Sequence, residues 1–377
     1  MIAVRQITHQ EREYWDSHVL QYEACSPFNA YAWGLVRSTD GWEPLYLVAE
    51  RSGRFCGAIM VLMKRLPATP FSVFYSPRGP LLDWSDREAL QALIEKVREQ
   101  ATARKAIFLR SDPNVPEGSA GPITESLASI GYVHLNERWT FWNSPRDVSR
   151  IDLTRVSSAE ELFNLLDRDT RRCIRKAGRE GVTIETAKTE EELKSFYNIF
   201  KDFSVTKGFM ARDYDYQKMV WDTFILSDLG KLFVAKYRGE IIGGLMCIMF
   251  GRKCIAMHMG TPYKYQKLQS YYTYVWESIK WAKEQGCSYY SFRGVGTTPS
   301  QEYFKRKFLP EVISLCGYYD LPFRPTLYKV WRFGEFSLVP KLWPALIYGR
   351  KLLSNLQPVY RRSLDRLAGR QLHHSLP

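Results

Sequence analysis

The feature of this 377-residue chain that most constrains its fold is a local pattern that occurs twice. Residues 45–63 and residues 232–250 each contain an apolar run, a short charged turn with glycine, and a second apolar run that carries glycine. Two buried strands around a short polar turn give this pattern, so each copy predicts a β-hairpin. A helical stretch and a further strand follow each hairpin, with the strands at 106–110 and 289–292. The sequence therefore predicts a duplicated fold with a cleft between its halves.

Length and composition agree with two globular domains. The chain exceeds the usual size of a single core, and 45% of its residues are hydrophobic. Its longest run of apolar residues and glycine, 241–251, is shorter than the roughly 20 residues of a membrane-spanning helix. The first residues lack the hydrophobic stretch of a secretory signal and the seven cysteines are scattered, so we expect a cytoplasmic protein with reduced thiols. The six histidines lack metal-ligand spacing, and no metal site is expected.

Patterns along the chain divide it into two mixed α/β units and a tail. Residues 1–150 form the first expected unit, which the segment 325–335 is expected to complete. Residues 151–324 form the second, which begins with a helix predicted from Ser158 to Gly181.

The expected tail, residues 336–377, interleaves basic and apolar side chains. Two interpretations are open for it. It forms a C-terminal helix packed on the first domain, or it forms an amphipathic basic helix that touches a membrane surface.

A stripe of arginines is the strongest physical signal for a binding surface. Arg168, Arg172, Arg175 and Arg179 recur at spacings of four, three and four, so they share one helical face. Like charges along one face repel one another, and the whole chain carries a net charge of +13. The stripe is either a solvated surface or a site for a polyanion such as nucleic acid or a pyrophosphate.

The repeated hairpin, helix and strand resemble the GNAT acyltransferase fold. GNAT enzymes usually hold the pyrophosphate of coenzyme A on a glycine-rich loop at a helix N-terminus. The corresponding segments here, 260–270 and 76–80, lack that glycine pattern. We therefore expect two tandem GNAT-like domains that use a different acyl carrier.

Six further segments occur in a characteristic order. They are 31–34 (YAWG) with Arg37 and 41–42 (GW), 75–83 (YSPRGPLLD), 109–113 (LRSDP), 171–181 (RRCIRKAGREG), 208–212 (GFMAR) with Tyr216, and 304–308 (FKRKF). Together they resemble the FemABX family of aminoacyltransferases, which build peptidoglycan interpeptide bridges. The resemblance extends to about residue 330. The sequence departs from the family at Arg37, where a lysine is usual, and at Ser291, where an aspartate is frequent.

The resemblance implies an aminoacyl-tRNA donor, which makes a cofactor unnecessary. It implies as acceptor a peptidoglycan precursor, either lipid II or UDP-MurNAc-pentapeptide, whose amine attacks the aminoacyl ester. The residues that it implies for acceptor binding are Arg37, Tyr75, Arg78, Arg212 and Tyr216.

On the donor side, the resemblance implies that Phe304 and Lys305 lie at the acceptor end of the tRNA. Lys305 would then stabilise the negative charge that develops on the ester carbonyl. The tRNA-binding candidates on the arginine stripe are Arg172, Arg175 and Arg179.

Asp112 is the second catalytic candidate, because it follows a predicted strand near the expected cleft. It orients the attacking amine, or it forms a turn with the proline that follows it. Two other functions compete with aminoacyl transfer. One is a coenzyme A-dependent N-acyltransferase that acts on a sugar or exopolysaccharide precursor, and the other is a non-catalytic module that binds RNA or a membrane.

Overall fold

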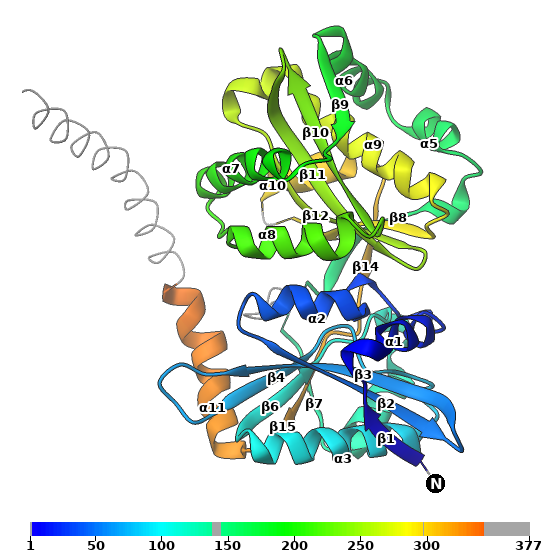
Figure 1. Cartoon of the computed structure of the whole chain (residues 1–377), viewed down its shortest axis with the longest axis vertical. Helices are drawn as coiled ribbons and strands as arrows, with labels where there is room; N and C mark the ends of the chain where they lie inside the picture. Colours follow the sequence, from blue (N-terminus) through cyan, green and yellow to red (C-terminus); the bar gives the residue numbers. More distant parts are fainter. Residues whose placement is uncertain (1, 138–144, 297, 343–377) are drawn as a thin grey trace, which may run out of the picture.

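The computed structural model describes residues 2–137, 145–296 and 298–342, which contain two mixed β-sheets, one in each lobe of the molecule (Figure 1). The first sheet runs in the order β1 (Ile2–Gln6), β2 (Glu43–Arg51), β3 (Arg54–Arg65), β4 (Ser72–Ser76), β6 (Ala106–Ser111), β15 (Tyr318–Pro322) and β7 (Val133–Leu135), and β5 (Leu81–Leu82) pairs with β3. The second runs in the order β14 (Glu311–Ser314), β8 (Asp147–Asp152), β13 (Tyr289–Gly294), β12 (Lys253–Gly260), β11 (Glu240–Phe250), β10 (Gly230–Tyr237) and β9 (Val182–Thr186).

The two sheets correspond strand by strand, which confirms the predicted duplication. In each, three antiparallel pairings lead to one parallel pair, β4 with β6 and β12 with β13. Parallel neighbours need a crossover connection, and helices α3 (Arg87–Ala103) and α9 (Ser270–Glu284) supply it. Each sheet then continues with an antiparallel strand, β15 or β8. The fold is therefore two tandem GNAT-like domains.

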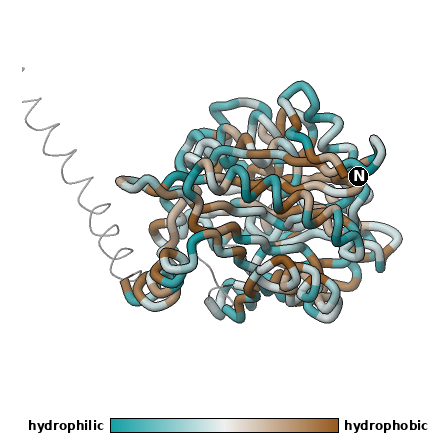
Figure 2. The backbone as a smooth tube through the Cα atoms, turned by 90° about the horizontal axis from the view of Figure 1, so that it is seen from below, coloured by the Kyte–Doolittle hydropathy of each residue, from teal (hydrophilic) through white to brown (hydrophobic). Residues whose placement is uncertain are grey.

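The other helices lie on the faces and edges of these sheets. In the first lobe they are α1 (Arg12–Val19), α2 (Tyr31–Ser38), α4 (Gly121–Ser129) and the C-terminal α11 (Pro325–Phe333). In the second they are α5 (Ala159–Leu165), α6 (Arg168–Arg179), α7 (Glu190–Lys207), α8 (Tyr214–Val220) and α10 (Pro299–Arg306). Hydrophobic residues concentrate along the strands, and hydrophilic segments lie mostly at the periphery (Figure 2).

Both predicted hairpins are present and share one kind of turn. Ser52 and Gly53 link β2 to β3 with φ angles of 51° and 76°, and Arg238 and Gly239 link β10 to β11 with 51° and 83°. Two successive positive φ values match the right-handed twist of the flanking strands. The glycine in each charged turn therefore has a local conformational reason.

The helix predicted from Ser158 to Gly181 is wrong as a single element. The chain forms α5, breaks at Leu166 in extended conformation, and begins again with α6. Asp167 caps the new helix, because its Oδ1 accepts a hydrogen bond from the backbone N–H of Thr170 at 2.6 Å. The arginine stripe is consequently a short separate helix.

The two lobes share one apolar core cluster. It combines residues of α1 and α2 with residues of α7, α8 and the adjoining π-helical turn Trp221–Ile225. At the junction Trp33 meets Tyr216 edge to face, with 6.4 Å between ring centroids. Burial of apolar surface thus fixes the lobes against each other and sets the geometry of any site between them.

The chain returns to the first lobe after it has completed the second. Strand β15 inserts between β6 and β7, and α11 packs beside β6 (Figure 1). The expected boundary at residue 150 falls inside β8, and the expected closing segment 325–335 falls on α11 and the turn that follows it. Most of the predicted tail, from 343 to 377, lies outside the described residues.

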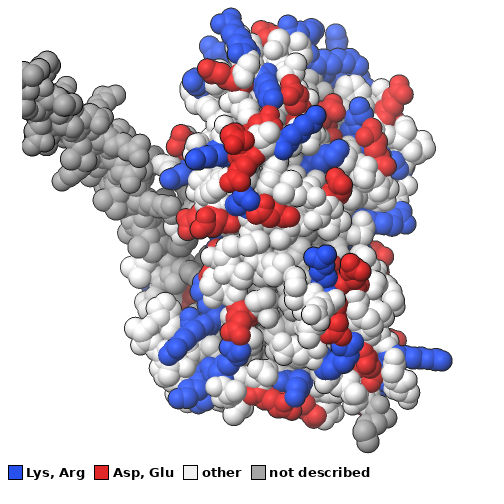
Figure 3. All heavy atoms as spheres, viewed as in Figure 1, with Lys and Arg blue, Asp and Glu red and all other residues white. Residues whose placement is uncertain are grey.

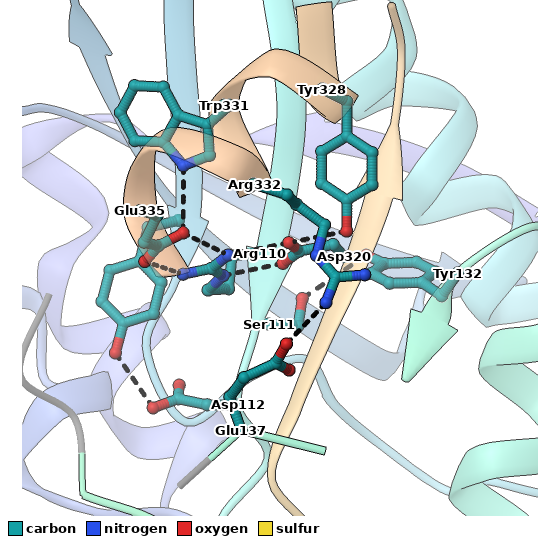
Figure 4. Close-up of polar contacts among 11 residues, drawn as sticks. Arg110, Ser111, Asp112, Tyr132, Glu137, Asp320, Tyr328, Trp331, Arg332 and Glu335 are labelled. Carbon is teal, nitrogen blue, oxygen red and sulfur yellow. Dashed lines mark hydrogen bonds and ion pairs between the residues drawn. The ribbon is translucent and has the colours of Figure 1, made fainter. Parts of the chain in front are cut away.

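A buried ion-pair network attaches this C-terminal helix (Figure 4). The guanidinium of Arg110, on β6, donates two hydrogen bonds to Asp320 at 2.7 and 2.8 Å and two to Glu335 at 2.7 and 3.0 Å. Tyr328 also donates to Asp320, and Trp331 to Glu335, each at 3.0 Å. Fork-like arginine pairing of this kind is geometrically specific, so it fixes the register of the helix on the sheet.

Candidate functional site

Asp112, Tyr75 and Arg78 meet at one end of the first sheet. Because β4 and β6 are parallel, their C-terminal ends, and the residues that follow them, lie at the same end of the sheet. The buried Asp112 carboxylate accepts hydrogen bonds from the Tyr75 hydroxyl at 3.0 Å and from the Arg78 backbone N–H at 2.7 Å. Its Oδ2 also lies 3.5 Å from Arg78 Nη1. In this arrangement Asp112 holds the Arg78 turn and its guanidinium in place.

Four other residues link helix α2 to the second lobe. Arg37 Nε lies 3.3 Å from Asp40 Oδ2, and Asp40 Oδ1 lies 3.0 Å from Arg212 Nη1. The Arg212 guanidinium lies over the Tyr216 ring at 5.6 Å. Burial lowers the pKa of Arg37, and Tyr216 and Asp40 favour its charged form. The structure thus brings Arg37, Arg212 and Tyr216 together, and Asp40, which the sequence analysis missed, bridges them.

Lys305 lies at the open end of β13. Its ammonium donates hydrogen bonds to the carbonyl oxygen of Phe292 at 3.2 Å and to that of Gly294. Burial lowers the pKa of Lys305 to about 8, and the charge of Arg293 lowers it further. The Phe304 ring lies on another side of α10, where it packs against Tyr272 of α9 with 5.2 Å between ring centroids. The phenylalanine anchors α10 while the lysine reaches the end of the strand.

Arg293 connects Lys305 with the arginines of the first lobe. Burial lowers the pKa of Arg293, and the charges of Arg78, Arg212 and Arg37 lower it further. Arg293 is therefore close enough to interact with all of these cations. No sequence pattern marked Arg293, because an arginine at a strand end is ordinary until the fold places it at the junction of the lobes.

The arginine stripe lies away from this junction. Arg172, Arg175 and Arg179 are exposed on α6, as predicted. Arg175 lies over the Phe163 ring at 5.1 Å, and Arg172 Nη2 lies 3.4 Å from Asp169. Their grouping with Lys305 on the donor side stays a prediction.

One ion pair joins that surface to α10. Lys307 Nζ lies 2.9 Å from Asp167 Oδ2, just before the first turn of α6. Basic and acidic side chains are otherwise interspersed over both lobes on the face shown in Figure 3. The cations of the junction are thus distinguished by their convergence rather than by a dominant charged patch on this face.

The part of the chain that the structure describes contains no cluster of three or more histidine, cysteine or acidic side chains suited to a metal ion. His258 is half-buried against the Phe200 ring, and desolvation lowers its pKa to about 3. It is therefore neutral at physiological pH. Among the described helices, none is both long enough and apolar enough to cross a bilayer.

Comparison with known structures first defines a class. The tandem GNAT protein from the clavulanic acid biosynthesis pathway matches with a TM-score of 0.54 and 11% identity, over 85% of this chain and 98% of that one. FemX matches with a TM-score of 0.77 and 20% identity, over 87% of this chain and 99% of that one. Both show that this arrangement of two GNAT-like domains is known.

Sequence comparison then gives the family. The FemAB family model matches residues 10–238 and 229–335, and the chain belongs to this family. Lipid II:glycine glycyltransferase from Staphylococcus aureus is 27% identical over 234 residues, which cover 61% of this chain and 54% of that protein. The chain thus spans about half the length of the curated relatives that it matches.

Proposed function

We propose that this protein is an aminoacyltransferase that moves an amino acid from an aminoacyl-tRNA to the amine of a peptidoglycan precursor. Membership of the FemAB family supports the reaction class, and the relative named lipid II:glycine glycyltransferase supports the acceptor class. Either lipid II or UDP-MurNAc-pentapeptide would serve as acceptor. A protein that uses charged tRNA works in the cytoplasm, and the reaction needs no cofactor or metal.

The observation that carries the proposal is the convergence of cations at the junction of the lobes. Arg37 and Arg212 are joined through Asp40, and the charge of Arg293 interacts with those of Arg37, Arg212 and Lys305. Both precursors carry a pyrophosphate, and the donor carries phosphates beside its ester. Arginine is the side chain best suited to phosphate oxygens. The junction therefore has the electrostatics to hold both substrates side by side.

The reaction depends mainly on how the acceptor amine and the aminoacyl ester are positioned. The acceptor amine attacks the ester carbonyl, the new C–N bond forms, the C–O bond to the tRNA ribose breaks, and the amine proton passes to the departing ribose oxygen. Lys305 would stabilise the oxyanion that forms in between. Asp112 acts through Arg78 and Tyr75, which it holds by hydrogen bonds. An activated ester and an amine held in contact need little further catalysis.

The proposal is tested by incubating the full chain with charged total tRNA and each precursor in parallel, with mass spectrometry as readout. We expect one acceptor to gain the mass of an aminoacyl group. Uncharged tRNA and acetyl-coenzyme A serve as controls. Modification from acetyl-coenzyme A alone would contradict the proposal and support a coenzyme A-dependent N-acyltransferase instead.

We also propose a peripheral contact with the inner face of the membrane through the C-terminal segment. Its described part exposes Val330, Phe333 and Leu338. Lys329 and Lys341 are exposed beside them. Apolar and basic side chains together suit an anionic lipid surface, which is where a lipid-linked acceptor would be met.

A further inference from the structure

A small pocket between the lobes contains three arginines, of which the proposed reaction leaves Arg150 without a role. Its polar lining comes from both sides: Arg78 and Asn114 from the first lobe, and Arg150, Tyr289 and Arg293 from the second. Phe28, Val148 and Ile255 supply apolar walls. Among these residues, only Arg78 belongs to the sites predicted from the sequence.

Two of the three guanidinium groups have no carboxylate within ion-pair distance among the described residues. Arg78 faces Asp112, whereas Arg150 donates only to the side-chain oxygen of Asn114 and lies over the Tyr289 ring at 4.5 Å. The Nε of Arg150 is buried and has no hydrogen-bond partner. Arg293 lies 6.0 Å from the centre of the Phe28 ring. Arg150 and Arg293 are half-buried, and cations withdrawn from water without a counter-charge are costly, so a negatively charged group in this pocket would be stabilised.

Backbone geometry directs two of these arginines into the pocket. Arg293 and Arg78 adopt left-handed conformations, with φ of 64° and 53°, which residues other than glycine adopt rarely. The pairing of β13 with β8 shifts register between Ser291 and Gly294, which is a bulge beside Arg293. The Ser291 hydroxyl accepts the Arg293 backbone N–H at 3.1 Å. Such strain and bulges cluster at functional sites, where they orient a side chain.

The size of the pocket limits what it takes. Its cavity volume is about 20 Å³, so only a small group can enter it. A carboxylate or a single phosphate group, entering as the end of a larger molecule, meets that limit. Planar guanidinium groups bind both oxyanions through paired hydrogen bonds.

We infer that the pocket formed by Arg78, Arg150 and Arg293 binds one oxyanion group, a carboxylate or a phosphate, at a site distinct from the Arg37–Asp40–Arg212 link. This inference rests on the proposed function in one respect only, which is the identity of the molecule that carries the oxyanion. A carboxylate would come from the peptide of the acceptor. A phosphate would come from the 3′ end of the donor or from the acceptor's pyrophosphate.

The test observes the arginine side chains directly in the full-length wild-type protein. The Nε–H resonances of Arg150 and Arg293 are assigned with the variants R150K and R293K and followed by NMR during titration with acetate and, separately, inorganic phosphate. We expect both resonances to shift with saturation. A shift with acetate identifies the carboxylate source, and a shift with phosphate identifies the phosphate source. If neither resonance moves with either anion, the inference is overturned.

Variants provide an independent measurement. R150Q is expected to weaken binding of the active anion at least tenfold. The matched control, R54Q with R238Q, removes two exposed arginines from the hairpin turns and is expected to leave that affinity unchanged. Equal affinities for R150Q and wild type, with both folded by circular dichroism, would also contradict the inference. Failure of aminoacyl transfer with the NMR shifts intact would refute the proposed function and leave the pocket standing.

Discussion

The Nζ atom of Lys305 lies 3.2 Å from the carbonyl oxygen of Phe292, so the end of one strand holds the ammonium group in place. The side chain reaches this carbonyl from α10, thirteen residues further along the chain. A lysine held this way is preorganised, and its burial makes its charge sensitive to pH near neutrality.

Lys305→Ala should lower the single-turnover rate of transfer at least about tenfold at pH 7. Because the pKa of Lys305 is lowered to about 8, the side chain is charged below that pH and neutral above it. The ratio of wild-type to variant rates should therefore fall towards one as pH rises beyond about 9. Taking the ratio removes the ionisation of the acceptor amine, which both proteins share. A ratio that does not change between pH 6.5 and 9.5 would contradict a role for the lysine charge.

Lys307→Ala is the matched control for Lys305. Lys307 faces Asp167, so its charge is engaged in an exposed ion pair outside the junction. We expect little change in the transfer rate. Equal and small effects of both substitutions would show that this basic segment supplies only diffuse charge.

Arg37→Ala and Arg212→Ala should each weaken acceptor binding by roughly 10- to 100-fold, because charge-assisted hydrogen bonds are worth about 1.5–3 kcal/mol. Titration calorimetry with the nucleotide-linked precursor measures the effect. Arg238→Ala, at an exposed hairpin turn, is the control and should bind normally. Unchanged affinity in both cleft variants would place the acceptor elsewhere.

The arginine stripe on α6 is tested through salt dependence. Replacing Arg172, Arg175 and Arg179 together by Ala should flatten the log–log dependence of tRNA affinity on salt by up to roughly 0.7–0.9 per lost phosphate contact. The double variant Arg54→Ala, Arg238→Ala removes two exposed arginines from hairpin turns and serves as the charge control. Identical slopes for the triple variant and wild type would make the stripe a solvated surface.

Arg110→Met should destabilise the protein by about 3–5 kcal/mol, because it leaves Asp320 and Glu335 buried without their cation. Urea denaturation measures the free energy of unfolding. The control is Arg51→Met, which removes an arginine whose ion pair with Asp86 is more exposed and should cost less than about 1 kcal/mol. Equal losses would show that the buried network does not secure the C-terminal helix.

The proposed membrane contact predicts that the full chain floats with vesicles containing anionic phospholipid. Phe333→Glu together with Leu338→Glu should reduce the bound fraction severalfold, because it places negative charge on the exposed apolar face. Leu165→Glu alters an exposed apolar residue of the second lobe and should have no effect. Absence of flotation by the wild-type chain would refute the contact.

The sequence predicted those parts of the fold that local pattern determines. Both hairpins carry their signal in a few neighbouring residues, and the family motifs identified Arg37, Arg212 and Lys305, which the structure places around one junction. Arg293 was missed because its position depends on a bulge opposite another strand. The partnership of Arg110 with Glu335 joins residues 225 apart, a separation that no local pattern encodes.

The insertion of β15 between β6 and β7 has a consequence for how the protein is made. On the ribosome, the first lobe cannot close its sheet until residues 318–322 have emerged, because β7 pairs with β15 and has no pairing with β6. During that interval the edge of β6 is open to strands from other chains, while the second lobe, which already has all its strands once β14 has emerged, is free to fold. The N-terminal lobe is therefore translated first but completes its sheet last, only a few residues after β14 has supplied the final strand of the second lobe.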